Sequence, residues 1–307
     1  MSWLIVGSVP RADFPLAWGD YRLRDEMLHL DGQRIRVARG TPALMAVAAV
    51  SAEVLGVPVP QALLAGDIGT GEGSRALYRH LTENIQQILH QGLTFHYLLP
   101  DISWHNKILW GLEELTRTPI LVADAGFMYA AKMSGYAGHY DLFTPDVGEM
   151  AFLADEVAPH PFYTRGFLLQ EEERTPELVQ RAYAEENAAR HLLVKGKKDY
   201  VVAAGKIVAE IGSPDVPAME PIGGTGDTLT GLVTALLASG MEMVTACRTA
   251  ALANRYLGLL ADPTPAFGVT DLLPFLPRAL ERALKRTLEE GVRGSNEPAV
   301  LPDLSYK

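Results

Sequence analysis

Apolar runs of strand length alternate with longer helical patterns through most of this 307-residue chain. Repeated strand–helix units of this kind predict an α/β fold with a mostly parallel sheet and helices on both faces. The strands expected for the sheet are 4–6, 62–66, 94–99, 119–123, 141–144 and 191–194. The helices expected around it are 41–55, 73–90, 103–115, 126–133, 147–155, 177–190, 227–238, 243–260 and 271–290.

Short alternating segments near the N-terminus predict a small β-rich edge. Tyr21–Arg24, Met27–Leu30 and Arg34–Val37 alternate in polarity, and Asp31-Gly32 is a typical hairpin turn. A second hairpin is expected over 200–211. No convincing linker divides the chain, and residues 155–175 read as a loop or lid base. We therefore expect one domain over 1–290, followed by a polar C-terminal tail over 291–307.

The composition excludes several classes of protein. Hydrophobic residues make up 48% of the chain, which is enough for a packed core, and the formal net charge is −10. This acidic balance opposes nucleic-acid binding, which needs a basic face. The single cysteine, Cys247, excludes an internal disulfide and a cysteine-based metal centre. No signal peptide or bilayer-spanning helix is evident, so we expect a cytoplasmic protein without a membrane partner.

The strongest local motif is a glycine-rich segment that opens a predicted helix. Gly223-Gly224-Thr225-Gly226 precedes Asp227 and an apolar helical run. Glycines let successive backbone N–H groups point at one anion, and the helix N-terminus adds partial positive charge. Asp227 has two interpretations at this stage. It is either an ordinary helix N-cap or a general base facing a bound phosphate.

A second glycine-rich loop, 66–74, follows one predicted strand and precedes a helix. Ser74 replaces the third glycine of a dinucleotide fingerprint, and the chain has no Gly-x4-Gly-Lys-Ser/Thr phosphate loop. Asp67 at the strand end is expected to face substrate, because open α/β sheets bind ligands at that edge. An ordinary connector is the equally weighted alternative.

Further polar residues follow other predicted strands. Asp124 ends the strand 119–123, Glu149 lies on the first turn of a helix, and Lys195-Gly196 follows the strand 191–194. Each alone has an ordinary explanation, such as a dipole-stabilising acid or a solvated lysine. Together they predict a site at one edge of the parallel sheet.

The order of these motifs resembles the ribokinase-like superfamily, and within it the ADP/ATP-dependent NAD(P)H-hydrate dehydratases. The resemblance covers roughly residues 119–260. It is carried by Asp124 after its strand, Thr144-Pro145-Asp146-Val147-Gly148-Glu149, Val194-Lys195-Gly196 and Gly223-Gly224-Thr225-Gly226-Asp227.

The resemblance implies a three-layer α/β/α fold, Mg²⁺, and ADP or ATP. It also implies roles for individual residues. Asp227 would be the catalytic base, and Glu149 would act on Mg²⁺ through water. The expected nucleotide and anion contacts are Gly224, Thr225, Gly226, Lys195 and Gly196. The expected substrate contacts are Asp67, Asp124 and Thr144.

The chain departs from the dehydratase pattern at several positions. Asp146 stands where the family has His, and Gly126-Phe127 replaces its Ala-Leu. The N-terminal Lys-Gly…Gly-Gly-Ser substrate segment is missing, with 39–43 as its only trace. We therefore expect a dehydratase first, and a small-molecule kinase of the same superfamily as the alternative.

A non-catalytic nucleotide-binding protein of this fold is the third hypothesis. The expected partners are a nucleotide and a small-molecule substrate. Assembly into a homo-oligomer is left open.

Overall fold

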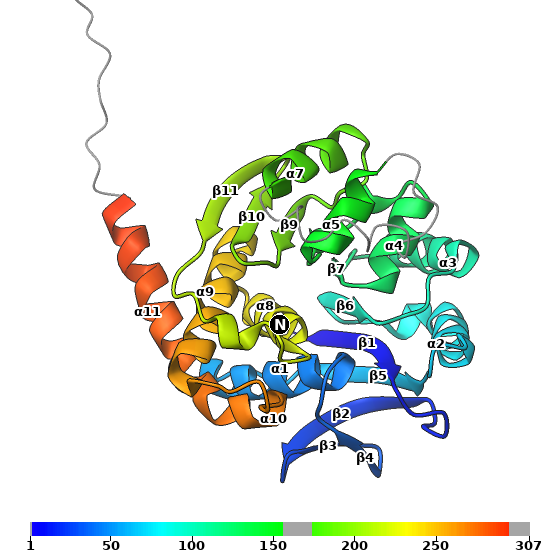
Figure 1. Cartoon of the computed structure of the whole chain (residues 1–307). Helices are drawn as coiled ribbons and strands as arrows, with labels where there is room; N and C mark the ends of the chain where they lie inside the picture. Colours follow the sequence, from blue (N-terminus) through cyan, green and yellow to red (C-terminus); the bar gives the residue numbers. More distant parts are fainter. Residues whose placement is uncertain (1, 156–173, 295–307) are drawn as a thin grey trace, which may run out of the picture.

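The strands form one eleven-stranded sheet in the order β11-β10-β9-β8-β7-β6-β1-β5-β2-β3-β4 (Figure 1). This is seen in a computed structural model that describes residues 2–155 and 174–294. The strands from β9 to β5 in that order are parallel. They are β9 His191–Val194, β8 Leu142–Phe143, β7 Ile120–Ala123, β6 Gly92–His96, β1 Trp3–Val9 and β5 Gln61–Gly66. The predicted parallel core is confirmed.

Antiparallel strands extend both ends of this parallel core. At one end β2 (Ala17–Arg24) pairs with β5, and β3 (Met27–Leu30) and β4 (Gln33–Arg36) follow. At the other end, β10 (Asp199–Ala203) and β11 (Lys206–Ile211) form the second predicted hairpin. Asp31 and Gly32 have φ angles of 46° and 73°, as the predicted turn between β3 and β4 requires.

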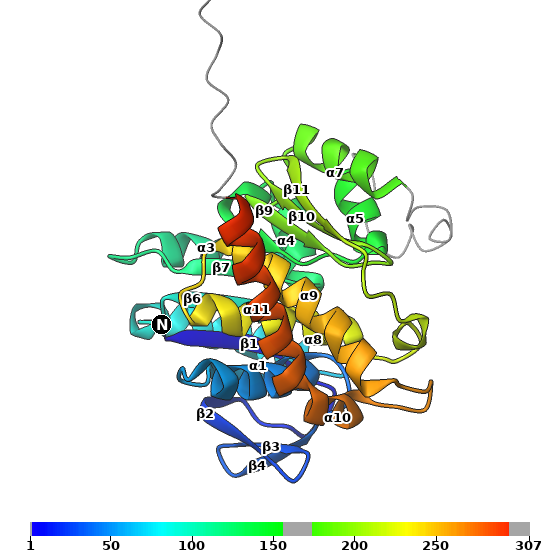
Figure 2. The same cartoon turned by 90° about the vertical axis from the view of Figure 1, so that its left-hand side faces the viewer.

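Helices cover both faces of the sheet and give the three-layer α/β/α arrangement (Figure 2). One layer holds α1 (Thr41–Leu55), α8 (Thr225–Ala238), α9 (Met243–Ala261) and α11 (Leu276–Gly294). The other holds α2 (Glu72–Glu83), α3 (Ile102–Glu113), α4 (Gly126–Met133), α5 (Val147–Ala154) and α7 (Thr175–Ala184). Successive side chains of β1 alternate between the two cores, with Ile5 in one and Leu4 and Val6 in the other.

Three predicted helices differ from the structure. The helix expected over 73–90 ends at Glu83, and a short 3₁₀ turn follows at Ile85–Gln87. The helix expected over 177–190 is α7, which ends at Ala184. The helix expected over 271–290 is divided into α10 (Val269–Leu272), a 3₁₀ turn (Leu273–Phe275) and α11. Pro274 lies at this division and has no N–H to donate to the preceding turn.

The predicted C-terminal tail begins inside helix α11. Helix α11 runs four residues past the expected domain end at residue 290, and residues 295–307 lie outside the described chain. Most of the loop expected over 155–175 also lies outside it. Among the helices that are described, none is long and apolar enough to cross a bilayer.

Candidate active site

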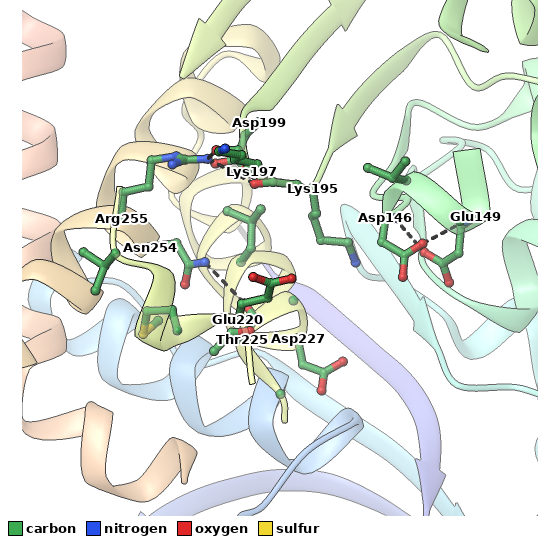
Figure 3. A pocket seen from close by; sticks show the side chains of 18 of the residues that line it. Asp146, Glu149, Lys195, Lys197, Asp199, Glu220, Thr225, Asp227, Asn254 and Arg255 are labelled. Carbon is green, nitrogen blue, oxygen red and sulfur yellow. Dashed lines mark hydrogen bonds and ion pairs between the residues drawn. The ribbon is translucent and has the colours of Figure 1, made fainter. Parts of the chain in front are cut away.

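A cavity of about 890 Å³ opens at the carboxyl ends of the parallel strands (Figure 3). Its wall includes Asp124 and Ala125 after β7, the first turn of α5, Lys195 and Gly196 after β9, and the first turn of α8. This is the edge at which open α/β sheets bind ligands. The structure therefore brings most of the predicted site residues to one cavity.

The first turn of α8 presents backbone N–H groups to this cavity. Gly224 is the N-cap with φ 104°, and Thr225 and Gly226 begin the helix. A Cβ atom at Gly224 would lie 2.7 Å from Val269 Cγ2, so both the φ angle and the available space require glycine there. The first N–H groups of a helix have no partner within the helix, and they attract anions. The start of α8 thus has the backbone geometry that the glycine motif predicted.

Asp227 is the third residue of α8, and its N-cap interpretation is wrong. No side chain caps this helix. Instead, Asp227 Oδ2 accepts a hydrogen bond of 2.5 Å from the backbone N of Gly40, at the start of α1. The residue is 8% exposed and lines the cavity. Its carboxylate is therefore held by a distant segment and faces the space where a ligand would bind.

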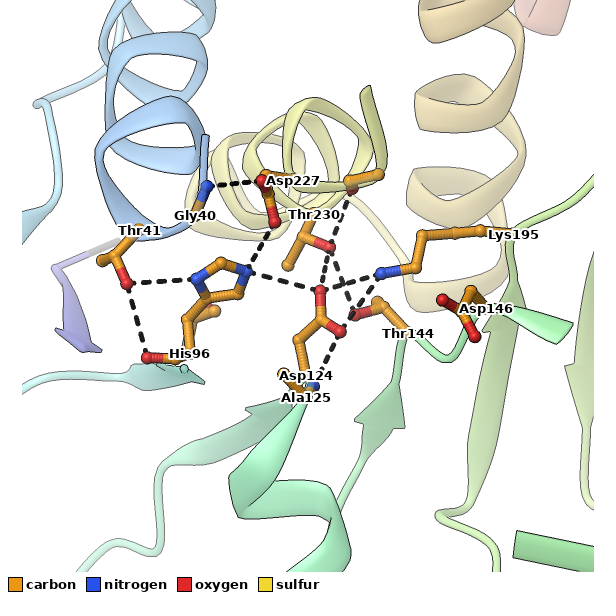
Figure 4. A network of polar contacts seen from close by, with 12 residues as sticks. Gly40, Thr41, His96, Asp124, Ala125, Thr144, Asp146, Lys195, Asp227 and Thr230 are labelled. Carbon is orange, nitrogen blue, oxygen red and sulfur yellow. Dashed lines mark hydrogen bonds and ion pairs between the residues drawn. The ribbon is translucent and has the colours of Figure 1, made fainter. Parts of the chain in front are cut away.

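His96 at the end of β6 is the main residue that the sequence analysis missed. Its Nε2 lies 3.2 Å from Asp227 Oδ1 and 3.6 Å from Asp124 Oδ2 (Figure 4). Its Nδ1 lies 3.1 Å from Thr41 Oγ1, and the side chain is fully buried. The predicted strand 94–99 placed His96 in mid-strand, so the strand-end argument that selected Asp124 passed over it, whereas β6 in fact ends at His96.

Asp124 and Lys195 form a buried ion pair in the cavity wall. Lys195 Nζ donates to both carboxylate oxygens of Asp124 at 2.9 and 3.1 Å, and Thr230 Oγ1 donates to Oδ2 at 2.6 Å. Burial alone would raise the pKa of Asp124, but Lys195, His96 and these hydrogen bonds hold it below its usual range. Burial likewise opposes the charge on Lys195, yet Asp124 and Glu149 raise its pKa. Both groups are therefore charged at neutral pH.

Glu149 belongs to a capping box at the start of α5. Its Oε2 accepts from Asp146 N at 2.8 Å, while Asp146 Oδ1 accepts from Glu149 N at 2.7 Å. Tyr129 OH donates to Oε1 at 2.8 Å. Burial, followed by the charges of Asp146 and Asp124, raises the pKa of Glu149 to about 8. Its carboxyl is thus poised to ionise when a cation arrives.

The residues fit a magnesium ion that arrives with phosphate better than one held by protein alone. No group of three or more His, Cys, Asp or Glu side chains with metal-binding geometry occurs in residues 2–155 and 174–294. Mg²⁺ commonly keeps several waters and binds through one or two carboxylates plus substrate phosphates. Glu149 and Asp146 line the cavity and supply carboxylates of that kind.

Two predicted substrate contacts lie outside the cavity wall. Thr144 is fully buried, with its Oγ1 3.2 Å from Thr230 Oγ1, so it supports the Asp124 network from below. Asp67 accepts hydrogen bonds of 2.8–3.0 Å from Gly69, Gly71 and Ser74. Its carboxylate holds the loop before α2, which corresponds to the connector alternative. Neither residue is carried into the substrate contacts proposed below.

Helix α9 contributes two cavity residues that no sequence motif indicated. Arg255 donates to Asp199 Oδ2 at 2.8 Å and to the carbonyl oxygens of Gly196 and Lys197 at 3.1 and 2.8 Å. Asn254 accepts from Thr228 Oγ1 at 2.6 Å. These contacts fix the loop after β9 and the first turn of α8. In the sequence both residues are simply polar positions of a long helix.

Comparison with known proteins identifies the family. The family model described as NAD(P)H-hydrate dehydratase matches residues 99–276, which include Asp124, Glu149, Lys195 and Asp227. The chain belongs to this family. An uncharacterized protein of Methanocaldococcus jannaschii is 39% identical over 221 residues, covering 72% of this chain and 90% of that protein.

A bifunctional NAD(P)H-hydrate repair enzyme of Pyrobaculum aerophilum is 26% identical over 252 residues. That match covers 80% of this chain and 44% of the enzyme, so the chain spans less than half of the bifunctional relative. His96 and Thr41 lie before the segment that the family model matches.

Solved structures show that the fold is ribokinase-like. A phosphofructokinase-2 mutant of Escherichia coli superposes with a TM-score of 0.53 at 14% identity, covering 92% of this chain and 99% of that chain. A pyridoxal kinase of Entamoeba histolytica gives a TM-score of 0.54 at 12% identity, covering 90% and 95%. With this family and fold the protein is an enzyme, of either the dehydratase or the ribokinase-like kinase type.

Proposed function

We propose that this protein is an ADP- or ATP-dependent NAD(P)H-hydrate dehydratase. In such a reaction a phosphoryl group passes to the hydroxyl of the hydrated nicotinamide ring, and elimination of phosphate restores NAD(P)H. The observation that carries the proposal is the arrangement of Asp227 beside the free N–H groups of α8 in one cavity. This arrangement supplies a base and an anion site for the same phosphoryl transfer.

The residues around the cavity suggest a division of roles. Asp227 would accept the proton of the substrate hydroxyl, while Gly224, Thr225 and Gly226 would bind the transferring phosphate. Lys195 and Gly196 line the same cavity, and Arg255 donates to the carbonyl oxygen of Gly196. We propose that the nucleotide binds along these two residues. Asp124 would contact the substrate or hold Lys195 in position.

Glu149 and Asp146 would hold the Mg²⁺ of the nucleotide through water. When bound, that ion supplies charge neutralisation for the phosphates. The elevated pKa of Glu149 supports this role, because a nearby cation would favour its charged form.

A small-molecule kinase is the second candidate. The family match begins at residue 99, so β1 to β6 and α1 lie outside it. This unmatched part also includes Gly40, the N-cap of α1, and His96, and both contact the Asp227 carboxylate. A kinase would use the same base and anion site, but its phosphoester would be the released product.

The test is to incubate the purified protein with hydrated NADH, Mg²⁺ and either ADP or ATP, and to follow NADH absorbance. We expect absorbance to rise with one of the nucleotides. Asp227→Asn should lower turnover by about 10³-fold, because it removes the base while keeping its shape. Nucleotide binding, measured by calorimetry, should persist in the variant.

A wild-type protein that leaves hydrated NADH unchanged with both nucleotides would exclude the dehydratase. A panel of hydroxyl-bearing sugars and vitamin precursors with ATP then tests the kinase. If the panel also yields no phosphoester, the non-catalytic alternative stands.

We also propose that residues 1–290 act as one domain in the cytoplasm. The continuous sheet supports the first point, and the single cysteine supports the second. A nucleotide and a small molecule are the proposed partners. Sedimentation measurements would determine whether the enzyme is a homo-oligomer.

A further inference from the structure

Gly40 and His96, from two separate segments of the N-terminal half, approach the Asp227 carboxylate. Gly40 N donates to Oδ2, and His96 Nε2 lies 3.2 Å from Oδ1 (Figure 4). His96 is fully buried at the end of β6, and Nε2 makes no hydrogen bond of good geometry with any described residue. A buried polar atom without a partner is costly, so its position calls for a physical explanation.

The neighbours of His96 determine where its hydrogen must be. Nε2 faces the carboxylates of Asp227 and Asp124, which can only accept hydrogen bonds when ionised. A bare nitrogen lone pair pointing at two carboxylates would be repelled. Nε2 therefore carries a hydrogen on the side that the two carboxylates occupy, without a hydrogen bond of good geometry to either of them, whether Nδ1 donates to Thr41 or accepts from it.

The surroundings hold the imidazole in this orientation. Thr41 Oγ1 contacts Nδ1 at 3.1 Å and the His96 carbonyl oxygen at 3.4 Å. The ring of Tyr97 packs edge-on against the imidazole, with centroids 4.7 Å apart. Thr41 itself has no room to move toward β1, because a Cβ at Gly7 would lie 2.5 Å from its Oγ1. The imidazole is thus fixed before any ligand binds.

We propose that His96 is a positioning residue that keeps Asp227 ionised and aimed at the substrate hydroxyl. This inference rests on the proposed function, in which Asp227 is the base. A hydrogen donor beside a carboxylate favours its charged form, which is the form that can accept a proton. The charged groups around the imidazole are Asp227 on α8 and Asp124 after β7, and Lys195 balances Asp124 from the far side.

The test compares two variants that differ in which nitrogen they mimic. His96→Asn keeps a donor near the Nδ1 position but loses the hydrogen toward Asp227, whereas His96→Gln can place an amide N–H near Nε2. For His96→Asn we expect the acidic side of the plot of kcat against pH to move to higher pH by about one unit. At the acidic end of that plot, this shift corresponds to about a tenfold loss of turnover. His96→Gln should largely restore the wild-type profile.

If turnover fell by the same factor at every pH in both variants, the role of His96 would be merely structural, and the proposal would be overturned. If His96→Asn does not fold, Thr41→Val takes its place. It frees the imidazole and should shift the acidic side of the kcat profile in the same direction by a smaller amount. If the acidic side of the kcat profile did not move in Thr41→Val, that result would also count against the proposal.

A second readout does not depend on turnover. The carboxyl carbon of Asp227 can be titrated by ¹³C NMR in the ligand-free protein and assigned by comparison with Asp227→Asn. We expect it to ionise at lower pH in the wild type than in His96→Asn. Equal titration in both would refute the inference even if the enzyme is a dehydratase. If the titration of Asp227 shifted in His96→Asn but the wild type showed no turnover, the proposed function would have failed and not this inference.

Discussion

Replacing Glu149 by Gln should change how the stability of the protein depends on pH. The substitution keeps the size of the side chain and an oxygen that can accept from Asp146 N, but it removes a titrating group. The pKa of Glu149 is raised from 4.5 to about 8 by burial and by the charges of Asp146 and Asp124. The folded wild type therefore binds a proton that the unfolded chain releases between those two values.

The sign follows from this difference in bound protons. When the folded state binds more protons than the unfolded state, stability falls as pH rises. The wild type should thus lose stability from pH 4.5 to 8, whereas Glu149→Gln should not show this loss. Linkage at about 1.4 kcal/mol per pH unit gives an upper limit of about 5 kcal/mol for the full shift. Glu149 is only part-buried and solvent screens its charge, so we expect about 2 kcal/mol.

Urea unfolding followed by circular dichroism at pH 5, 7 and 9 measures this effect. The free energy of unfolding of Glu149→Gln relative to wild type should rise across the series. Glu177→Gln is a matched control at the first turn of α7, because Arg174 lowers the pKa of Glu177. That group stays ionised across this range, so the control should show no trend. If the free energies of unfolding of wild type and Glu149→Gln changed in parallel with pH, the reasoning would be refuted.

Two further substitutions test the Asp124 network by the same unfolding assay. Lys195→Met should destabilise the protein by about 3 kcal/mol, because it leaves the Asp124 side chain, 3% exposed, without its ion-pair partner. Stability unchanged by Lys195→Met would mean that Thr230 and the Ala125 N–H suffice for that carboxylate. Ala125→Gly should stabilise the protein by about 1 kcal/mol, because Ala125 has φ 50° and ψ −132°, a region that favours glycine. A loss of stability in Ala125→Gly would contradict the inferred strain.

Local sequence patterns predicted the architecture well, because the spacing of apolar residues and the residue types at turns act over short distances in the chain. The alternation of strands and helices indicated the parallel sheet, and Asp31-Gly32 marked its hairpin turn. The glycines before α8 likewise indicated an anion site, because the backbone freedom that such a site needs is a local property. Apolar spacing alone was not sufficient at Pro274. The helical spacing predicted one helix over 271–290, but the helix is interrupted around that proline.

The separation of the site residues along the chain could not predict how the site is assembled. The polar side chains at the ends of β6, β7 and β9 meet only because parallel pairing puts those ends at one edge. Asp67 ends a parallel strand too, yet hydrogen bonds within its own loop occupy its carboxylate.

The sequence by itself determined the fold class, the family and the chemical types of the groups in the cavity. Only the tertiary structure decided that Asp227 is held by Gly40 and faces His96. Those contacts join residues that are 187 and 131 positions apart, so no local pattern encodes them. They depend on the packing of α1 and α8 on the same face of the sheet, which fixes where two distant segments meet.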